Sequence, residues 1–200
     1  VKQPGIVGEG NILDIGANVG FTAIVLAKYL RPGYLVYAFE PERFNFQLLC
    51  ETVAAHRVAD RVIALRLAIG AVRGSAELVI NRAHPGDHHL LMPGTAETRP
   101  TEEVELESID HLIAQAKVST PIALIKIDVQ GMEGEVCRGL KQTIEQHPDI
   151  KIIVEIGRRE LARAGTLPIE VFDFLGMMGL IAFQIGNSGE LSPLSRDQLV

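Results

Sequence analysis

The chain has 200 residues, of which 47% are apolar and 22% charged, the size and balance of one ordinary globular domain. Its formal net charge is −6 and it has no basic stripe, which argues against nucleic acid as a partner because an acidic surface repels phosphates. No apolar run reaches the roughly 18 residues that a membrane span requires, and the N-terminal residues do not resemble a signal peptide.

Short β-rich runs alternate with longer runs of helical periodicity along the whole chain. The expected strands are 11–15, 34–39, 62–69, 76–80, 104–106, 122–129, 150–156 and 180–185. The expected helices carry apolar residues at helical spacing and cover 23–30, 46–53, 109–116, 136–144 and 171–178. Near-continuous Val, Ile and Leu strands that alternate with helices predict an α/β fold, with a Rossmann-like, doubly wound and mostly parallel sheet covered by helices on both faces. We expect residues 1–200 to form one such domain.

Residues 81–100 differ from the rest of the chain. They hold three prolines and two glycines and show little periodicity. An irregular stretch of this length inside a compact domain is often functional. We therefore expect it to be an insert that crosses the mouth of the site and contributes to an acceptor pocket.

The two cysteines, Cys50 and Cys137, form neither a disulfide framework nor a CxxC metal motif. Both lie in apolar helical segments, so we expect two buried small hydrophobes. Isolated thiols of this kind favour a reducing compartment, and we expect a cytoplasmic protein.

Glycines and a carboxylate follow the first two expected strands. The turn after the first strand reads Asp14-Ile-Gly16-Ala-Asn18-Val-Gly20, and Glu40 ends the second strand. In parallel sheets the ligand binds at the carboxyl ends of the strands, where glycines let it approach the backbone. A carboxylate at the next strand end can accept hydrogen bonds from both hydroxyls of a ribose. The pair predicts a nucleoside site.

The glycine pattern is informative about which nucleoside binds. A dinucleotide fingerprint would need glycines at 16, 18 and 21, but Asn18 and Phe21 occupy two of these positions. The turn therefore lacks a close pyrophosphate cradle. S-adenosylmethionine (SAM) has no phosphate, and an Asn side chain suits its amino-acid end. A nicotinamide-dependent oxidoreductase remains the alternative enzyme class, and a glycine turn that binds no ligand remains the structural alternative.

Six stretches resemble the FkbM family of SAM-dependent methyltransferases in order and spacing. They are DIGANVGFTA (14–23), VYAFEPERFNFQLL (36–49), LAIG (67–70), VELESID (104–110), IKIDVQGMEGEVCRGL (125–140) and IIVEI (152–156). The resemblance implies a class I methyltransferase with SAM as methyl donor. It also implies methylation of an oxygen on a small-molecule or carbohydrate acceptor, such as a sugar, glycolipid or secondary metabolite.

The resemblance also implies roles for individual residues. The residues that would hold the methionine part of SAM are Asp14, Gly16, Ala17, Asn18 and Gly20, with Thr22 near its carboxylate. Glu40 would hold the ribose, and Ala68 and Ile69 would flank the adenine. Asp128 would face the methyl donor and the acceptor.

The chain departs from the family pattern at three places. Gln130 stands where the family usually has Glu, which leaves one fewer candidate base. Ala71 stands where a polar or acidic residue is common, which weakens any polar contact to adenine. The family's last strand is not apparent before Val200, so we expect the sheet to lack it. These departures keep open a third class of function, a non-catalytic SAM-fold binding module.

Methylation of a hydroxyl benefits from a base, because a neutral hydroxyl is a weak nucleophile. The candidates are Asp128, Glu155 and the pair His88-His89, with Glu133 nearby. Asp128 is the first choice, because a charge that closes an apolar strand is costly unless it has a role.

Each candidate base also has a structural interpretation. Asp128 could cap the next helix, Glu155 could form an ordinary salt bridge, and adjacent histidines are often merely solvated. Lys126 lies on the same strand face as Asp128 and either pairs with a carboxylate or extends to solvent. The spacing of Asp87, His88 and His89 is not specific for a metal, and we expect none.

Overall fold

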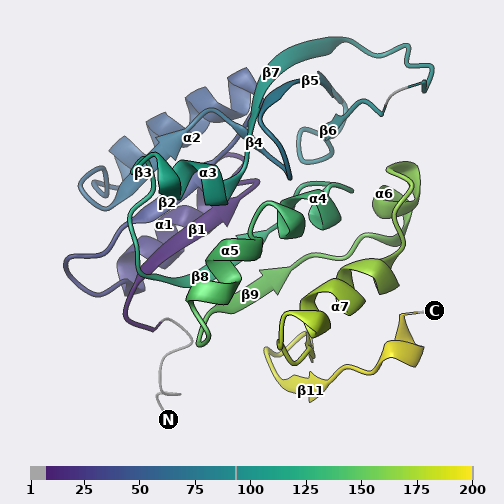
Figure 1. The fold of residues 1–200 in the computed structure, drawn as a ribbon. Helices are drawn as coiled ribbons and strands as arrows, with labels where there is room; N and C mark the ends of the chain where they lie inside the picture. The colour runs from purple at the N-terminus through teal and green to yellow at the C-terminus, as the bar shows by residue number, and fades with distance from the viewer. Residues whose placement is uncertain (1–7, 93, 200) are drawn as a thin grey trace.

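The fold is described from a computed structural model that covers residues 8–92 and 94–199 (Figure 1). Its strands are β1 (Asn11–Ile15), β2 (Val36–Phe39), β3 (Val62–Leu65), β4 (Ala68–Ile69), β5 (Gly74–Val79), β6 (His89–Leu90), β7 (Thr101–Glu107), β8 (Ile122–Ile127), β9 (Lys151–Val154), β10 (Phe183–Ile185) and β11 (Leu191–Pro193). Its helices are α1 (Phe21–Tyr29), α2 (Arg43–Ala55), α3 (Ile109–Ala114), α4 (Glu133–Arg138), α5 (Lys141–Gln146), α6 (Arg158–Arg163), α7 (Pro168–Met177) and the 3-10 turn η1 (Arg196–Gln198).

The central sheet has five strands in the order β3-β2-β1-β8-β9, and all neighbouring pairs are parallel. The order reverses between β1 and β8, which lie side by side although more than a hundred residues separate them in sequence. This is the switch point at which open α/β sheets bind ligands. The expected doubly wound, parallel α/β fold is confirmed.

Alternate residues of the central strands face two separate cores. Ile12 and Val36 pack with α1 and α2, whereas Leu13, Ile15 and Phe39 pack with α3 to α7. Figure 1 shows α1 and α2 on one face of the sheet and α4, α5 and α7 on the other. Both faces are thus covered, which explains why the strands read as continuous apolar runs.

The stretch 62–69, expected as one strand, is two strands in two sheets. β3 ends at Leu65 on the edge of the central sheet, and β4 pairs with β7 in a second sheet of order β4-β7-β5-β6. The two residues between them, Arg66 and Leu67, turn the chain from one sheet to the other. Both halves are apolar, so their periodicity hides the break. Among the described residues of the insert, 81–92 and 94–100, the two residues of β6 are the only regular structure.

The expected helix over 136–144 is two short helices that separate at Gly139. A Cβ at Gly139 would lie 2.0 Å from the Gly70 carbonyl oxygen, so the chain needs glycine to pass the second sheet there. The helix α6 was not expected from the sequence. β10, expected as a further strand of the sheet, pairs antiparallel with β11 and belongs to a separate hairpin.

Only one of the two cysteines is buried. Cys137 lies in the core, where burial raises the pKa of its thiol to about 12, but Cys50 is exposed. The expectation for Cys50 was wrong because the buried stripe of α2 runs through Asn45, Leu49 and Val53, one position away. No helix in the described part of the chain is long and apolar enough to cross a bilayer.

Candidate functional site

Four site residues predicted from the sequence follow the carboxyl ends of neighbouring central strands. Gly16 follows β1, Glu40 follows β2, Asp128 follows β8 and Glu155 follows β9. Backbone hydrogen bonds continue the sheet past these ends, from Asp128 N to Ile15 O at 3.1 Å and from Glu155 N to Ile127 O at 2.9 Å. The parallel register therefore brings residues from four distant parts of the sequence to one edge.

The turn after β1 depends on Gly16. Gly16 has φ +77°, and a Cβ there would lie 1.8 Å from the Asp128 carbonyl oxygen. Both the left-handed backbone and the close approach of the β8 loop exclude a side chain. Asn18 also has a positive φ, +49°, a conformation that Asn tolerates better than most residues. The turn thus presents backbone rather than side chains to the edge of the sheet.

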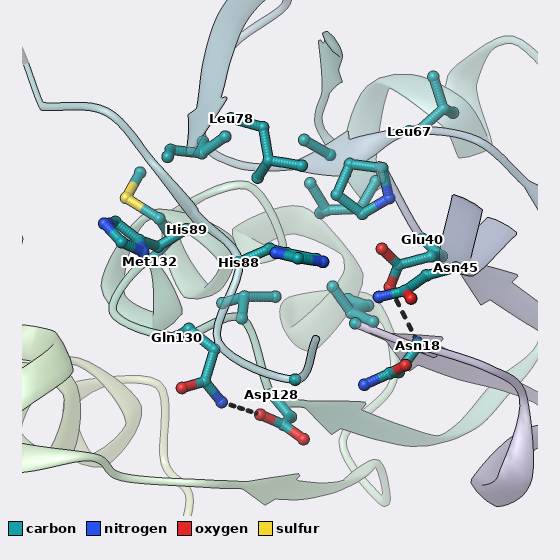
Figure 2. Close-up of a pocket in the computed structure, with 18 of the residues that line it drawn as sticks. Asn18, Glu40, Asn45, Leu67, Leu78, His88, His89, Asp128, Gln130 and Met132 are labelled. Atoms are coloured by element: carbon teal, nitrogen blue, oxygen red, sulfur yellow. Dashed lines mark hydrogen bonds between the residues drawn. The ribbon is translucent and has the colours of Figure 1, made fainter. Parts of the chain in front are cut away.

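The Glu40 carboxylate faces this turn and is 5% exposed. Its Oε2 accepts a hydrogen bond from the Asn18 backbone N–H at 2.9 Å (Figure 2). Its Oε1 accepts one from the Glu42 N–H at 3.0 Å. Burial raises the pKa of Glu40 to about 7, although both N–H groups favour the ionised form. The predicted pairing of the glycine turn with Glu40 is present in the structure.

Lys126 connects the ends of β1 and β8. Its Nζ donates to the Gly16 carbonyl oxygen at 2.7 Å and lies 3.2 Å from Asp14 Oδ1 and 3.5 Å from Asp128 Oδ2. Asp14 is fully buried, and among the described residues neither of its oxygens accepts a hydrogen bond of good geometry. Burial raises the pKa of Asp14, and the Lys126 charge opposes that rise. Of the two interpretations of Lys126, the structure supports carboxylate pairing.

Asp128 is half-buried and held from two sides. Gln130 Nε2 donates to its Oδ1 at 2.9 Å, as the dashed line in Figure 2 marks, while Lys126 lies near Oδ2. The exposed Glu155 is close enough for the negative charge of Asp128, with burial, to raise the pKa of Glu155.

Helix capping does not account for Asp128. The turn before α4 is held by Glu133, whose carboxylate accepts from Gly131 N at 3.1 Å and, more weakly, from Val129 N at 3.4 Å. Glu133 is 2% exposed, and burial raises the pKa of its carboxyl group. The Glu133 carboxylate therefore stabilises its own loop, and Asp128 lines the cavity.

Residues 85, 86 and 88–90 of the insert line the cavity. Asn45 Nδ2 donates to the Pro85 carbonyl oxygen at 3.0 Å, and Gly86 lies beside the Asn18 side chain. On the other side, Arg163 of α6 lies 3.4 Å from Asp87 and donates to the Gln130 carbonyl oxygen at 3.1 Å. These contacts hold the insert over the cavity from two directions.

The two histidines of the insert have different surroundings. The Asn81 N–H donates to His88 Nδ1 at 3.0 Å, which fixes the proton of a neutral ring on Nε2. His89 makes weak contacts through both nitrogens, with the Asp87 carbonyl oxygen and the Arg99 guanidinium, each at 3.4 Å. Burial lowers the pKa of both imidazoles. Figure 2 shows His88 directed into the cavity and His89 beside Met132.

The structure gathers most, but not all, of the predicted site residues around one cavity. Those that line it are Gly16, Asn18, Glu40, Ala68, Ile69, His88, His89 and Asp128. Those outside its lining are Asp14, Ala17, Gly20, Thr22 and Glu155. Gly20 instead packs against α2, because a Cβ there would lie 2.6 Å from Leu49 Cδ1. The cavity volume is about 80 Å³, since the insert lies across it.

Several residues that line the cavity were not expected from the sequence, among them Asn45, Met132 and Leu67. Asn45 had a readable signal, since it is a polar residue at the buried i, i+4, i+8 positions of α2. Met132 and Leu67 had none, because an apolar residue at a cavity wall looks like any core residue. Gln130 was expected only to depart from the family pattern. Its hydrogen bond to Asp128 has no signal in the sequence. The residues that the structure describes contain no group of three or more His, Cys, Asp or Glu side chains placed to hold a metal.

This geometry agrees with comparisons with known proteins. The sequence profile described as the methyltransferase FkbM domain matches residues 14–182. The chain belongs to the FkbM methyltransferase family. Its class as a methyltransferase is thereby established, and the glycine turn, Glu40 and Asp128 all lie within the matched region.

Two curated relatives of this FkbM-family chain are also methyltransferases. The hexuronic acid methyltransferase AglP of Haloferax volcanii is 28% identical over 192 residues, which cover 95% of this chain and 69% of AglP. Methyltransferase 1 of Beauveria bassiana is 27% identical over 177 residues, which cover 78% of this chain and 69% of that protein.

A solved structure shares the fold. The O-methyltransferase TomG from Streptomyces achromogenes, crystallised in complex with SAM, superposes with a TM-score of 0.50 at 15% identity. The superposition covers 90% of this chain and 68% of TomG. At this identity the likeness concerns the fold, and it confirms the Rossmann-like class I methyltransferase architecture.

Proposed function

We propose that the protein is a SAM-dependent O-methyltransferase that acts on a hydroxyl group of a sugar, glycolipid or secondary metabolite. The observation that carries the proposal is the buried Glu40 carboxylate. It is fixed by the Asn18 backbone and lines a cavity that Asp128 also lines. The name of AglP, a hexuronic acid methyltransferase, supports a sugar as the substrate. The name of TomG, an O-methyltransferase, supports oxygen as the atom that is methylated.

The residues present fit an adenosyl group. Each Glu40 oxygen accepts one backbone hydrogen bond, so each keeps a lone pair for a ribose hydroxyl. Ala68 and Ile69 offer an apolar wall for adenine, and Gly16 and Asn18 offer backbone and an amide to the amino-acid end. Asp14, Ala17, Gly20 and Thr22 act in this proposal by shaping the turn. When bound, SAM supplies an electrophilic methyl group on a sulfonium.

Asp128 is the proposed base. It lines the cavity, and Gln130 and Lys126 hold its two oxygens in place, so it can accept the proton of an acceptor hydroxyl. Glu155, beside it, can pass that proton toward solvent. His88 presents a fixed Nε2–H and therefore serves as a donor, while the contacts of His89 leave it a supporting role.

The insert must move for this site to fill. A volume of about 80 Å³ is well below the roughly 300 Å³ at which small-molecule pockets begin. Residues 85–88, which precede β6, lie over the turn and are held by polar contacts with Asn45, Asn81 and Arg163. Displacement of these residues is the least costly way to enlarge the cavity, because the strand ends beneath them belong to the packed core.

Calorimetric titration with SAM and with S-adenosylhomocysteine tests the proposal. We expect binding in the micromolar range, and Glu40→Ala to weaken it by roughly 1–3 kcal/mol through the unmade ribose hydrogen bonds. NAD and NADH serve as controls, because Asn18 and Phe21 replace two fingerprint glycines. A preference for NADH, or an affinity that Glu40→Ala leaves unchanged, would overturn the proposed role of this site.

An assay of methyl transfer distinguishes an enzyme from a non-catalytic module that only binds SAM. A tritiated methyl group from SAM should appear on glycoside acceptors and should not appear with Asp128→Asn. Binding of SAM without transfer to any acceptor in a broad panel would favour the binding module.

A further inference from the structure

A second hollow lies on the outer side of the insert. Its volume is about 460 Å³, within the range of roughly 300–1,000 Å³ that is typical of small-molecule sites. It is framed by the first turn of α2 and by residues 80–82 and 100–102, where β5 ends and β7 begins. Nothing described so far uses it.

The hollow adjoins the cofactor cavity. Asn45, Pro85 and His88 line both spaces, so one short segment of the insert forms the wall between them. Asn45 holds this wall through its hydrogen bond to Pro85, and the Asn81 N–H orients the His88 ring. A molecule in the hollow would therefore lie one side chain away from the cofactor.

The lining of the hollow has apolar and polar parts. Phe44 is 61% exposed although it is aromatic, and Ile80 and Pro100 extend the apolar part. An exposed ring on a helix surface costs solvation free energy, and the C–H face of a sugar is a partner that covers such a ring. The polar part includes Arg82, Thr101 and Glu102, whose side chains can donate to and accept from hydroxyl groups.

The charges favour a neutral ligand. Glu42 and Glu102 place two carboxylates at the hollow, Arg82 lines it, and Arg66 lies 3.9 Å from Glu102, so the opposite charges balance. Burial lowers the pKa of His88, which disfavours a further positive charge. With a net charge of −6 on the whole chain, a phosphate or nucleic-acid ligand would be repelled. A ring that carries hydroxyl groups satisfies the acceptors and donors without adding charge.

We propose that this hollow is the acceptor subsite and takes a neutral glycosyl unit, stacked on Phe44 and contacted at the shared wall by the Nε2–H of His88. The inference rests on the proposed methyltransferase function and names the substrate class of the same site. It places the residues that anchor the sugar on α2 and the insert, and the hydroxyl that is methylated must extend past Pro85 and His88 to reach Asp128.

Ligand-observed NMR on the protein without cofactor tests the subsite, with methyl β-glucopyranoside, methyl β-glucuronide and glucose 6-phosphate as probes. We expect saturation transfer to the neutral glucoside with a millimolar Kd, and weaker binding of the two anionic sugars. Phe44→Ala should weaken glucoside binding at least about fivefold. Phe183→Ala is the matched control, because Phe183 is half exposed on the distant hairpin and should leave binding unchanged.

The outcomes separate this inference from the proposed function. Absence of glucoside binding, equal effects of the two Phe variants or tighter binding of an anionic sugar would overturn the subsite, whatever SAM does. If Phe44-dependent glucoside binding is found but S-adenosylhomocysteine does not bind, the proposed methyl transfer fails while the subsite stands. His88→Gln, which keeps a donor amide, should bind the glucoside better than His88→Ala, whereas a purely steric wall would not distinguish them.

Discussion

The Lys126 ammonium lies 3.2 Å from the fully buried carboxylate of Asp14 and donates a hydrogen bond to the carbonyl oxygen of Gly16. One cation thus compensates a buried charge and fixes the backbone of the turn. Removal of one partner from a buried pair leaves the other uncompensated. The conformation of the glycine turn therefore depends on a residue from a strand more than a hundred positions later.

Lys126→Met should destabilise the protein by about 3–5 kcal/mol, measured by urea unfolding at pH 7. The loss should shrink as pH falls, because protonation of Asp14 removes the uncompensated charge. Asp14→Asn in the same chain should recover part of the loss, and Lys28→Met on the exposed face of α1 is the control. A loss below about 1 kcal/mol, equal to that of the control, would show that the pair is not important for stability.

The buried Glu40 predicts a definite pH dependence of stability. Its pKa in the folded chain is about 7, above its ordinary value of 4.5, so between these values the native state binds more protons than the unfolded state. Stability should therefore fall as pH rises from about 4.5 to 7 and then level off, with a total cost on the order of 3 kcal/mol.

Unfolding curves of the wild type and of Glu40→Gln at pH 5, 6, 7 and 8 isolate this contribution. The difference between the two proteins should change with pH in favour of the variant and reach a plateau above pH 7. Other titrating groups, including the histidines, cancel in that difference. A difference that stays constant with pH would mean that Glu40 ionises at its ordinary value.

Alanine substitutions at Gly16 and Gly33 separate the cost of backbone strain from the cost of a steric clash. Both have positive φ, but a Cβ at Gly33 meets nothing within 4 Å, whereas at Gly16 it would lie 1.8 Å from the Asp128 carbonyl oxygen. Gly33→Ala should cost about 1 kcal/mol, the strain alone. Gly16→Ala should cost more than about 3 kcal/mol or prevent folding. Equal losses in chemical denaturation would refute the close approach of the two loops.

Gln130 has a role that the corresponding glutamate could not fill. Gln130→Glu replaces the donor to Asp128 Oδ1 by a second carboxylate. Like charges repel only when both are ionised, so the variant should lose about 1 kcal/mol more at pH 8 than at pH 4, where the added glutamate is largely protonated. Gln142→Glu on the exposed side of α5 makes the same charge change away from the site. If both variants show the same pH profile of stability, the Gln130 amide does not position Asp128.

The ion pair between Arg163 and Asp87 should control how readily the insert opens. Trypsin cleavage after the exposed Arg82 reports opening of this segment, and Arg163→Gln should accelerate it severalfold. Arg163→Lys, which keeps the positive charge and adds no cleavage site, should retain part of the protection, whereas Arg159→Gln on the same helix should have no effect. Global stability should change by less than about 1 kcal/mol, since the ion pair is partly exposed.

The sequence predicted the central architecture because its signals are local. Glycine at 16, the carboxylates at 40 and 128, and the apolar runs before them gave the strand ends that meet in the structure. The break at Gly139 was hidden, because it arises from close approach to Gly70, a tertiary contact without a local pattern. The division of 62–69 between two sheets was hidden for the same reason.

The geometry of the site was less accessible to prediction. Lys126 could be placed on the face of Asp128, but its simultaneous contacts with Asp14 and Gly16 depend on the register of β8 against β1. The tautomer of His88 depends on the Asn81 N–H, and the second hollow depends on how the insert folds over α2. Side-chain identity constrains such features only once long-range pairing is known.

β4, which contributes Ala68 and Ile69 to the cofactor cavity, pairs with β7 and not with the central sheet. The same small sheet frames the insert that separates the cavity from the second hollow. Sequence changes that remodel the insert for a new substrate will therefore also disturb the wall that would face the proposed nucleoside. Evolution or engineering of altered specificity in this scaffold should carry a penalty in donor affinity, and compensating substitutions should arise along β5 and β7.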